Sequence, residues 1–331
     1  MKQVISCTGY GGTGSSVISD LLKEFSNVKS FGDFEFRFLQ DPGGVRELEF
    51  GLTNNNDRLL TSYYIKKFIR YTRSLKKYEI YFGNNFQNIT NTYLSEIIEL
   101  EWQGSWHQDI YDANSLKKII YVLEMLFIRK ILRIKEGGAI LHPIIFRDKM
   151  YYSNPSIDFV GCTKKYIRDL INSSAHEDKE ILVFDQIVPA SNAEQYSKYF
   201  DEIKIFIIDR DPRDLFLLNK LFWKEKWIPT ENTEKYISWY KGLRNKQSTG
   251  KNIKHMRFED FIYKYDQSVA EVCAFTGIKP CNHNNKMAYF NPLDSEKNVH
   301  LFNRYKSFSS EIHKIETELK RFCYDFHECK Q

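Results

Sequence analysis

The chain has 331 residues, the length of one large α/β domain with an insertion or of two domains. Its net charge of +5, from 48 basic and 43 acidic residues, is too small to indicate nucleic-acid binding. The six cysteines form no C-x-x-C pair, so they indicate neither a zinc site nor a disulfide framework. No stretch has the character of a signal peptide or a membrane span, and we expect a cytoplasmic protein.

The amino-terminal segment carries the most informative pattern. An apolar run, Val4–Cys7, leads into a glycine-rich loop, and an apolar-periodic helix follows. Backbone N–H groups and the helix dipole together favour an anion at such a junction. The spacing from Gly9 to Ser16 matches a Walker A loop, but Ser15 stands where that motif has lysine. We therefore expect these loop residues to bind a phosphate-like group: Gly11, Gly12, Thr13, Gly14, Ser15 and Ser16.

The next part of the chain is predicted to be an insertion. A short strand at 28–31 ends at Gly32 and Asp33, and no clear β run follows up to about residue 160. Helical periodicity appears instead, at 57–75, 89–100 and 115–135. We expect residues 33–160 to form a largely helical insertion over the end of the sheet.

Two stretches of this insertion mix apolar or aromatic side chains with charged ones. Residues 116–134 are apolar but contain several charges, which predicts an amphipathic, buried helix and not a membrane span. Residues 63–77 alternate rings with basic side chains, which favours a solvated helix face. The same pattern leaves open a contact with an acidic glycan or with the inner face of a membrane. Trp102 and Trp106 are candidates for stacking on sugar rings or for a place in the core.

The remaining chain alternates strands and helices. Short apolar runs predict buried strands at 180–184, 204–208 and 253–256. Periodicity predicts helices at 212–223, 232–245, 269–275 and 309–326. This order predicts an α/β fold with a doubly wound parallel sheet, in which ligands bind beyond the carboxyl ends of the strands.

A second motif follows the strand at 204–208. It reads Asp209-Arg210-Asp211-Pro212-Arg213-Asp214, with proline in the first turn of the next helix. The planar guanidinium of arginine is suited to phosphate because it donates two parallel hydrogen bonds. Since each arginine has an aspartate neighbour, a cluster of surface salt bridges is the alternative.

The two motifs, in this order, resemble the sulfotransferase family that uses 3′-phosphoadenosine 5′-phosphosulfate (PAPS). Residues 8–16 resemble its loop for the 5′-phosphosulfate, and residues 210–214 resemble its R-[DN]-P-x-D segment, whose arginine binds the 3′-phosphate. Residues 256–261 resemble the family's late R-[YF]-E-D-[LF] strand end. Residues 295–306 are similar to the carboxyl-terminal cofactor loop of bacterial carbohydrate sulfotransferases. The resemblance implies one domain over residues 1–331, PAPS as donor with PAP as product, and no metal. It also implies a carbohydrate acceptor, anionic or lipid-linked, which we expect to bind at the insertion over residues 33–160. Cofactor contacts are implied for Arg210, Arg304 and Lys306.

The chain departs from this family at two positions. Gly12 stands where the family's loop has lysine or arginine, so that charge is missing. Leu218 stands where the family has a serine for the 3′-phosphate, and the adjacent Asn219 is the candidate replacement.

Catalytic candidates come from the end of the second strand, where the resemblance directs the search for a base. Glu35 is the first choice and Asp33 the second, with pairing of Glu35 to Arg37 as the structural alternative. Arg37, Arg304 or Lys306 would supply the missing cation. His107 and His142 are further candidates.

Two other functions remain open at this point. A P-loop kinase would use Ser16 and Asp185 for Mg²⁺, against the absent lysine. A nucleotide-binding protein without turnover would explain both departures. The sequence does not indicate the acceptor or the oligomeric state.

Overall fold

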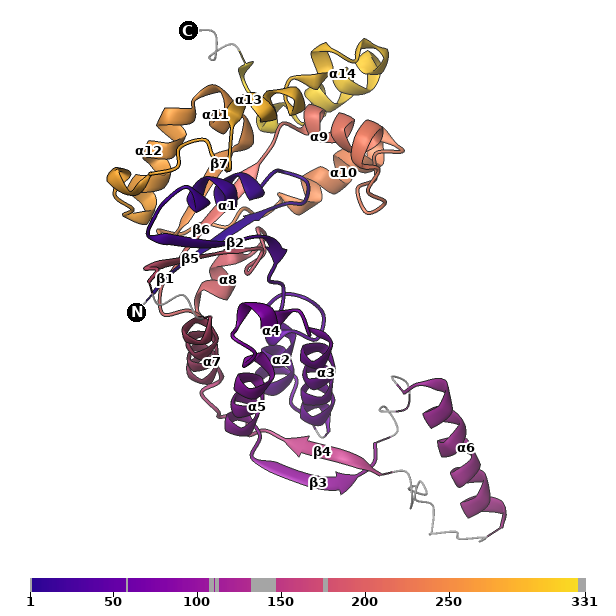
Figure 1. Cartoon of the computed structure of the whole chain (residues 1–331). Coiled ribbons are helices and arrows are strands. Elements are labelled where there is room, and N and C mark those ends of the chain that lie inside the picture. Colours follow the sequence, from indigo (N-terminus) through magenta and orange to yellow (C-terminus); the bar gives the residue numbers. More distant parts are fainter. Residues whose placement is uncertain are drawn as a thin grey trace. The chain divides into compact units, whose positions relative to one another are not determined.

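The computed structural model describes residues 2–57, 59–106, 110, 113–131, 147–174 and 178–326. The chain divides into two compact units: residues 1–40 with 174–331 form unit 1, and residues 41–173 form unit 2. The insertion predicted at 33–160 overlaps unit 2. Figure 1 labels the elements of both units.

Unit 1 is built on a parallel sheet. Its described residues form five strands in the order β2-β5-β1-β6-β7, and every neighbouring pair is parallel. The strands are β1 (Gln3–Gly9), β2 (Val28–Glu35), β5 (Ile181–Asp185), β6 (Ile203–Asp209) and β7 (Ile253–Arg257). The central strands β1, β5 and β6 are apolar and buried along nearly their whole length, as expected for strands covered on both faces. The predicted α/β fold with a parallel sheet is confirmed.

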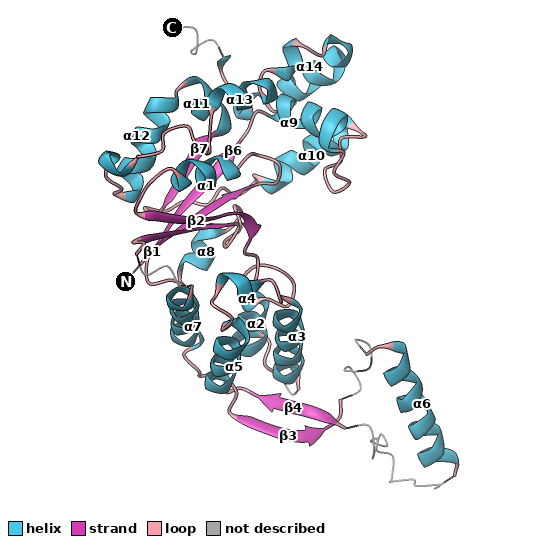
Figure 2. Cartoon of the chain, in the orientation of Figure 1, coloured by secondary structure: helices cyan, strands magenta, loops and turns pink. Residues whose placement is uncertain are grey.

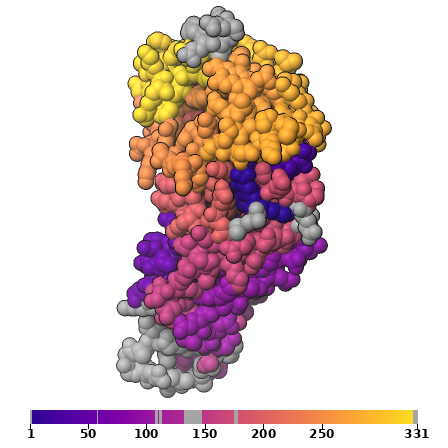
Figure 3. All heavy atoms as spheres, turned by 90° about the vertical axis from the view of Figure 1, so that its left-hand side faces the viewer, coloured from indigo at the N-terminus to yellow at the C-terminus, as the bar shows by residue number. Residues whose placement is uncertain are grey.

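Helices flank this sheet, with α1 on one face and α8 on the other (Figure 2). The helices of unit 1 are α1 (Ser16–Lys23), α8 (Ala193–Ser197), α9 (Pro212–Leu218), α10 (Thr233–Leu243), α11 (Phe258–Tyr263), α12 (Tyr265–Thr276), α13 (Pro292–Ser295) and α14 (Ser309–Glu318). Side chains of α1, α11 and α12 share a core with the strands, whereas α9, α10 and α14 share a second one. In the space-filling view the orange and yellow carboxyl-terminal segments form a continuous surface (Figure 3).

A buried ion pair joins the end of β6 to α10. Arg244, the residue that caps α10, donates from Nε and Nη2 to the two carboxylate oxygens of Asp209, at 2.8 and 2.6 Å. Burial opposes charge on Asp209, but the hydrogen bonds from Arg244 outweigh it and leave the pKa of Asp209 lowered. The guanidinium of Arg244 also lies over the rings of Tyr240 and Tyr10, 3.4 and 4.3 Å from their centroids. The pair therefore links the second motif to the glycine-rich loop.

Unit 2 contains helices α2 (Val45–Glu49), α3 (Leu60–Ser74), α4 (Tyr78–Tyr81), α5 (Phe86–Ile97), α6 (Ser115–Lys130) and α7 (Phe159–Ser173). Its core includes the contact of α5 with α7, where the rings of Tyr93 and Tyr166 stack at 4.5 Å. Their hydroxyls are hydrogen-bonded to Thr163 and Thr90. Among the described residues, no helix is long and apolar enough to cross a bilayer.

Unit 2 differs from the sequence-based expectation in two ways. An antiparallel pair, β3 (Leu100–Gly104) with β4 (Asp148–Tyr152), was not predicted, because β3 is largely exposed and has no buried apolar run. The helix predicted at 115–135 is present as α6, but the prediction that it is buried is wrong. Large apolar side chains of α6 are exposed, including Leu116 at 66% and Leu123 at 61%.

The buried pair gives a stability prediction. Replacing Arg244→Met should lower the free energy of unfolding by about 3–5 kcal/mol, because it leaves the Asp209 carboxylate buried without its partner. Urea denaturation followed by circular dichroism measures this. The matched control is Lys241→Met, which breaks the exposed pair of Lys241 with Glu318 and should change stability little. Equal effects of the two substitutions would contradict the role given to Arg244.

Candidate functional site

The glycine-rich loop connects β1 to α1 and requires glycine at several positions. Gly11, Gly12 and Gly14 have φ angles of +89°, +67° and +85°, a region that other residues rarely adopt. A Cβ atom on Gly11 would lie 2.3 Å from the ring of Trp227, and one on Gly14 would lie 2.6 Å from Phe258. The loop is therefore held against aromatic rings in a conformation that only glycine fits.

This loop opens onto a cavity of about 900 Å³ within unit 1. The cavity lies at the carboxyl ends of the strands, where parallel α/β sheets bind ligands. The first backbone hydrogen bonds of α1 run from Val17 N to Gly14 O and from Ile18 N to Ser15 O. The N–H groups that precede them belong to the helix N-terminus and favour an anion. Ser15 and Ser16 line the cavity.

Arg210 reaches the same cavity from the end of β6. Arg210 is only 2% exposed. Its guanidinium lies 3.7 Å from the ring centroid of Phe258 and 5.9 Å from that of Trp223. Nη1 donates to Gly12 O at 3.5 Å, whereas Nε is buried without a hydrogen-bond partner. Burial lowers the pKa of Arg210 to about 10. A buried donor without a partner is costly, so Arg210 is suited to an anionic ligand that completes its hydrogen bonds.

The rest of the second motif is structural. Arg213 donates to Asp211 and Glu316, each at 2.7 Å, and lies over the ring of Phe302. Asp214 accepts from two backbone N–H groups, those of His300 and Leu301. Burial, with Asp211 and Glu259 nearby, raises the pKa of Asp214 to about 8. The motif thus combines both alternatives: Arg213 belongs to a salt-bridge cluster and Arg210 faces the cavity.

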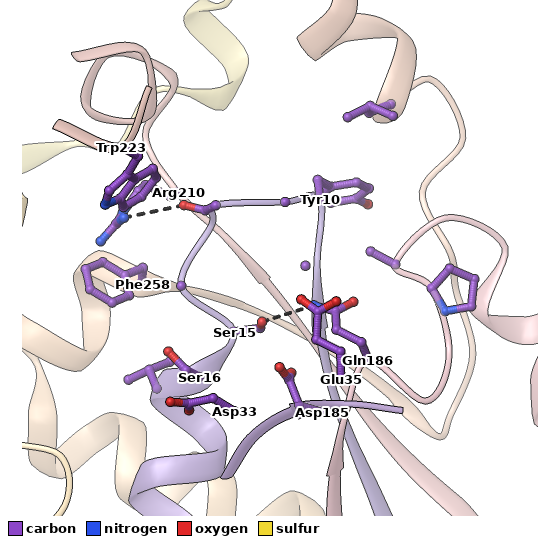
Figure 4. A pocket seen from close by; sticks show the side chains of 18 of the residues that line it. Tyr10, Ser15, Ser16, Asp33, Glu35, Asp185, Gln186, Arg210, Trp223 and Phe258 are labelled. Carbon is purple, nitrogen blue, oxygen red and sulfur yellow. Dashed lines mark hydrogen bonds between the residues drawn. The ribbon is translucent and has the colours of Figure 1, made fainter. Parts of the chain in front are cut away.

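Carboxylates gather on the other side of the loop, as Figure 4 shows for Asp33, Glu35 and Asp185. The pairing of β2 with β5 is interrupted after Ser30 and resumes where Glu35 lies opposite Asp185. The Glu35 side chain is 55% exposed, and its Oε2 lies 3.9 Å from Nη1 of Arg37. The pairing of Glu35 with Arg37, which the sequence analysis left open, is thus present as a long ion pair. Asp33 and Glu35, at the end of β2, and Arg37 just after it all line the cavity.

Asp185 is the carboxylate with the most unusual environment. It is 6% exposed, and its Oδ1 is buried without a hydrogen-bond partner. Burial, reinforced by the negative charges of Glu35 and Asp33, raises the pKa of Asp185 to about 8. Burial therefore favours the protonated form of Asp185 at neutral pH. The sequence marked this residue only for the kinase alternative, because its proximity to Glu35 depends on strand pairing.

Gln186 follows at once and connects these groups to the loop. Its φ of +54° is unusual for a residue other than glycine. Its side-chain oxygen accepts from Thr8 Oγ1 at 2.9 Å, and its Nε2 donates to Ser15 Oγ at 3.3 Å. Strained backbone next to a cavity is common at functional sites. The sequence analysis missed Gln186, although its position directly after a buried strand was a usable signal.

Aromatic and polar side chains complete the cavity and were also missed. Trp223 and Trp227 line it and are 41% and 54% exposed. From the carboxyl-terminal segment that resembles a cofactor loop, Ser295 and Asn298 line the cavity. The sequence analysis selected the cations Arg304 and Lys306 of this segment and not these two polar residues.

Several predicted residues do not line the cavity. Asn219 is 1% exposed and its amide is used inside the chain, since it donates to Thr230 and accepts from Glu225 N. It therefore cannot replace the missing hydroxyl, which corrects that hypothesis. Arg304 donates to carbonyls of the short turn that includes Lys297 and Val299.

Lys306 is hydrogen-bonded to Asn303 and does not line the cavity. Thr13 is buried and does not line the cavity either. His107 and His142 lie outside the described residues. Trp102 and Trp106 belong to unit 2, where Trp106 contacts Tyr63 edge-to-face.

No protein-family model matches this chain, and no curated protein matches it in sequence. Solved structures similar to it include the sulfotransferase domain of the olefin synthase from Synechococcus PCC 7002. That domain is 11% identical with a TM-score of 0.38, over 92% of this chain and 82% of the domain. The sulfotransferase domain from the curacin biosynthetic pathway is 12% identical with a TM-score of 0.38, over 97% of this chain and 98% of the domain. Likeness at this level carries no argument about function, which depends on the site itself.

The protonated state of Asp185 is testable through stability. Between about pH 4 and about pH 8 the folded chain keeps a proton that the unfolded chain releases. Asp185 therefore lowers the free energy of unfolding as pH rises through this range, by about 1.4 kcal/mol per pH unit at most. Asp185→Asn should remove this loss, so the variant gains stability relative to wild type between about pH 5 and about pH 8. Urea denaturation at a series of pH values measures the difference.

The cause of the shift has its own control. Glu35→Gln removes a neighbouring negative charge and should lower the pKa of Asp185, which carboxyl NMR follows directly. Parallel pH profiles for wild type and Asp185→Asn would contradict a proton on Asp185.

Proposed function

We propose that this protein is a PAPS-dependent sulfotransferase that transfers the sulfuryl group to a hydroxyl of a carbohydrate acceptor. The observation that carries the proposal is the presence of the glycine-rich loop and of buried Arg210 on one cavity, with Glu35 on its opposite side. The loop without a Walker lysine disfavours an ordinary ATPase. The carbohydrate acceptor rests on the resemblance of the sequence motifs alone.

The residues present fit an anionic nucleotide in part. The loop between Gly11 and Ser16 would hold the 5′-phosphosulfate through backbone N–H groups. Arg210, with its unpartnered Nε, would hold a second phosphate. The exposed rings of Trp223 and Trp227 offer surfaces on which a purine can stack.

The structure explains why the loop has no lysine at position 12. A side chain at Gly12 would begin 3.0 Å from Leu215 and 3.0 Å from Trp223, so the space of a lysine is taken by apolar groups. Arg37 is the remaining predicted cation that lines the cavity. We assign to Arg37 the stabilisation of negative charge that develops on the transferring group.

When bound, PAPS supplies an activated sulfuryl group. Glu35 accepts the proton of the acceptor hydroxyl, and its exposure leaves room for an acceptor to approach. Asp185, kept protonated by burial, limits the negative charge at this end of the cavity. The loop and the start of α1 provide hydrogen-bond donors that are fixed before the reaction, so they need no reorganisation.

A second function has support from one observation. Asp33, Glu35 and Asp185 lie on the side of the loop where Ser16 is (Figure 4), and a P-loop kinase would place Mg²⁺ near such groups. The described residues contain no cluster of three or more side chains arranged to hold a metal. Calorimetric titration with PAP, compared with ATP and Mg²⁺, separates the sulfotransferase from the kinase.

The catalytic assignment predicts the effect of Glu35→Gln. Turnover of the sulfated acceptor should fall by about 10²- to 10⁴-fold, because the amide cannot accept the proton. Affinity for PAP should stay unchanged, since Glu35 is not placed on the phosphates. The control is Glu202→Gln, an exposed residue outside the cavity. Unchanged turnover in Glu35→Gln would exclude Glu35 as the base.

The donor assignment predicts a nucleotide preference. Titration calorimetry should show micromolar binding of PAP and much weaker binding of ATP with Mg²⁺. Arg210→Met should raise the Kd for PAP by about 10- to 100-fold, the loss of one charged hydrogen-bond donor group. Lys306→Met, a cation of the same cofactor-loop segment that does not line the cavity, should bind PAP like wild type.

The opposite preference would overturn the proposal. Tight binding of ATP with Mg²⁺, without a requirement for the 3′-phosphate, would support the kinase. Unchanged PAP affinity in Arg210→Met would make Arg210 a structural residue.

A further inference from the structure

The apolar face of α6 is exposed to an extent that globular helices rarely show. We define this face by the residues that repeat every three or four positions on one side: Leu116, Ile119, Ile120, Leu123, Leu126, Phe127 and Ile131. Each of them is at least 44% exposed. Glu124, Met125 and Ile128 lie on another side of the helix and are at most 9% exposed. The helix therefore leaves its main apolar face exposed and buries a different side.

Basic residues accompany this face. Lys117 and Lys118 lie in the first turns of α6, and Arg129 and Lys130 lie in its last turn. The acidic residue of the helix, Glu124, is on the buried side. An apolar face with lysine and arginine beside it is typical of helices that lie in the interface of a membrane.

A cavity that shares Lys117 with α6 is also positively charged. This cavity of about 420 Å³ in unit 2 lies between α3, the start of α6 and β4. Five cationic side chains line it: Lys66, Arg70, Arg73, Lys117 and Lys149. Asp148 is the acidic residue among those that line it, and it lies 3.7 Å from Lys66. Asn114, which also lines the cavity, caps α6 by accepting from Lys117 N, so the positive end of the helix dipole adds to this field.

We propose that the apolar face of α6 and this basic cavity together bind the surface of an anionic lipid bilayer. The apolar side chains enter the boundary between headgroups and acyl chains, and the cavity takes lipid phosphates. A 16-residue helix with several charges lies along such a surface and does not cross it. This inference does not depend on the proposed function, because it concerns other residues and another unit.

Charge decides between a bilayer and a second copy of the chain. Two apolar faces of α6 packed together would bring the basic ends of both helices close, and like charges at this distance repel. An anionic bilayer instead attracts each lysine or arginine near its surface. A soluble anion would satisfy the cavity but would leave seven apolar side chains in water.

The test uses the full-length chain and co-sedimentation with vesicles. Wild type should bind vesicles of phosphatidylcholine mixed with phosphatidylglycerol, and should bind vesicles of phosphatidylcholine alone much more weakly. Binding should decrease as salt is added, because salt screens the attraction. The double variant L123Q/F127Q should lose at least about tenfold in the partition coefficient, since two apolar side chains that would enter the bilayer are removed. R73Q/K117Q should lose about tenfold and depend less on salt.

Two controls test whether vesicle binding is specific to this surface and independent of the proposed donor site. Ile80→Gln changes an exposed apolar residue of α4, 76% exposed, and should bind vesicles like wild type. PAP affinity should be the same in all these variants, so a failure of the lipid test leaves the donor site untouched.

Four outcomes would overturn the proposal. Wild type could fail to bind the anionic vesicles, or L123Q/F127Q could bind them as well as wild type does. Sedimentation equilibrium could show a wild-type dimer that L123Q/F127Q abolishes, which assigns the apolar face to a second copy. A lower melting temperature of L123Q/F127Q without vesicle binding by wild type would assign the face to packing within this chain.

Discussion

The arrangement of unit 1 depends on the buried ion pair between Asp209 and Arg244. Two hydrogen bonds at 2.6 and 2.8 Å fix the end of β6 to the end of α10. The same guanidinium lies over Tyr10, so the pair also supports the loop that follows β1. Because Asp209 is held in this way, the adjacent Arg210 is directed into the cavity and does not join the salt bridges around it. A charged pair out of water thus positions the arginine that we assign to the donor phosphate.

The cavity that results is divided by charge. One side holds Arg210 between aromatic rings, and the other holds the carboxyl groups of Asp33, Glu35 and Asp185, among which burial favours the protonated form of Asp185. Because the loop proposed to bind an anion lies beside these carboxylates, part of their negative charge must be neutralised. Protonation of Asp185 and the approach of Arg37 to Glu35 achieve this with residues of the chain. The division also suits transfer chemistry, since a base must lie near the group that is transferred but not on its binding loop.

Unit 2 shows a limit of periodicity as a predictor. The repeat of apolar residues in 115–131 correctly predicts a helix, because side chains three and four positions apart share a face. Periodicity does not say what covers that face, and α6 leaves it exposed. The strands β3 and β4 were not predicted, because the search for strands also relied on apolar patterns. They pair with each other without a buried apolar run, so they lack the signal by which strands are found.

The sequence by itself determined the local features: the strand, glycine-rich loop and helix at the amino terminus, the buried strands, and the motif around Arg210. These follow from short-range patterns of glycine, apolar and charged residues. Tertiary structure alone decided which polar groups meet. The side-chain amide of Asn219 is hydrogen-bonded to Thr230 and Glu225. Asp185 lies opposite Glu35 because β5 pairs with β2, which is far from it in the chain. Register, burial and the competition of neighbours for hydrogen bonds are properties of the folded chain, and no local pattern encodes them.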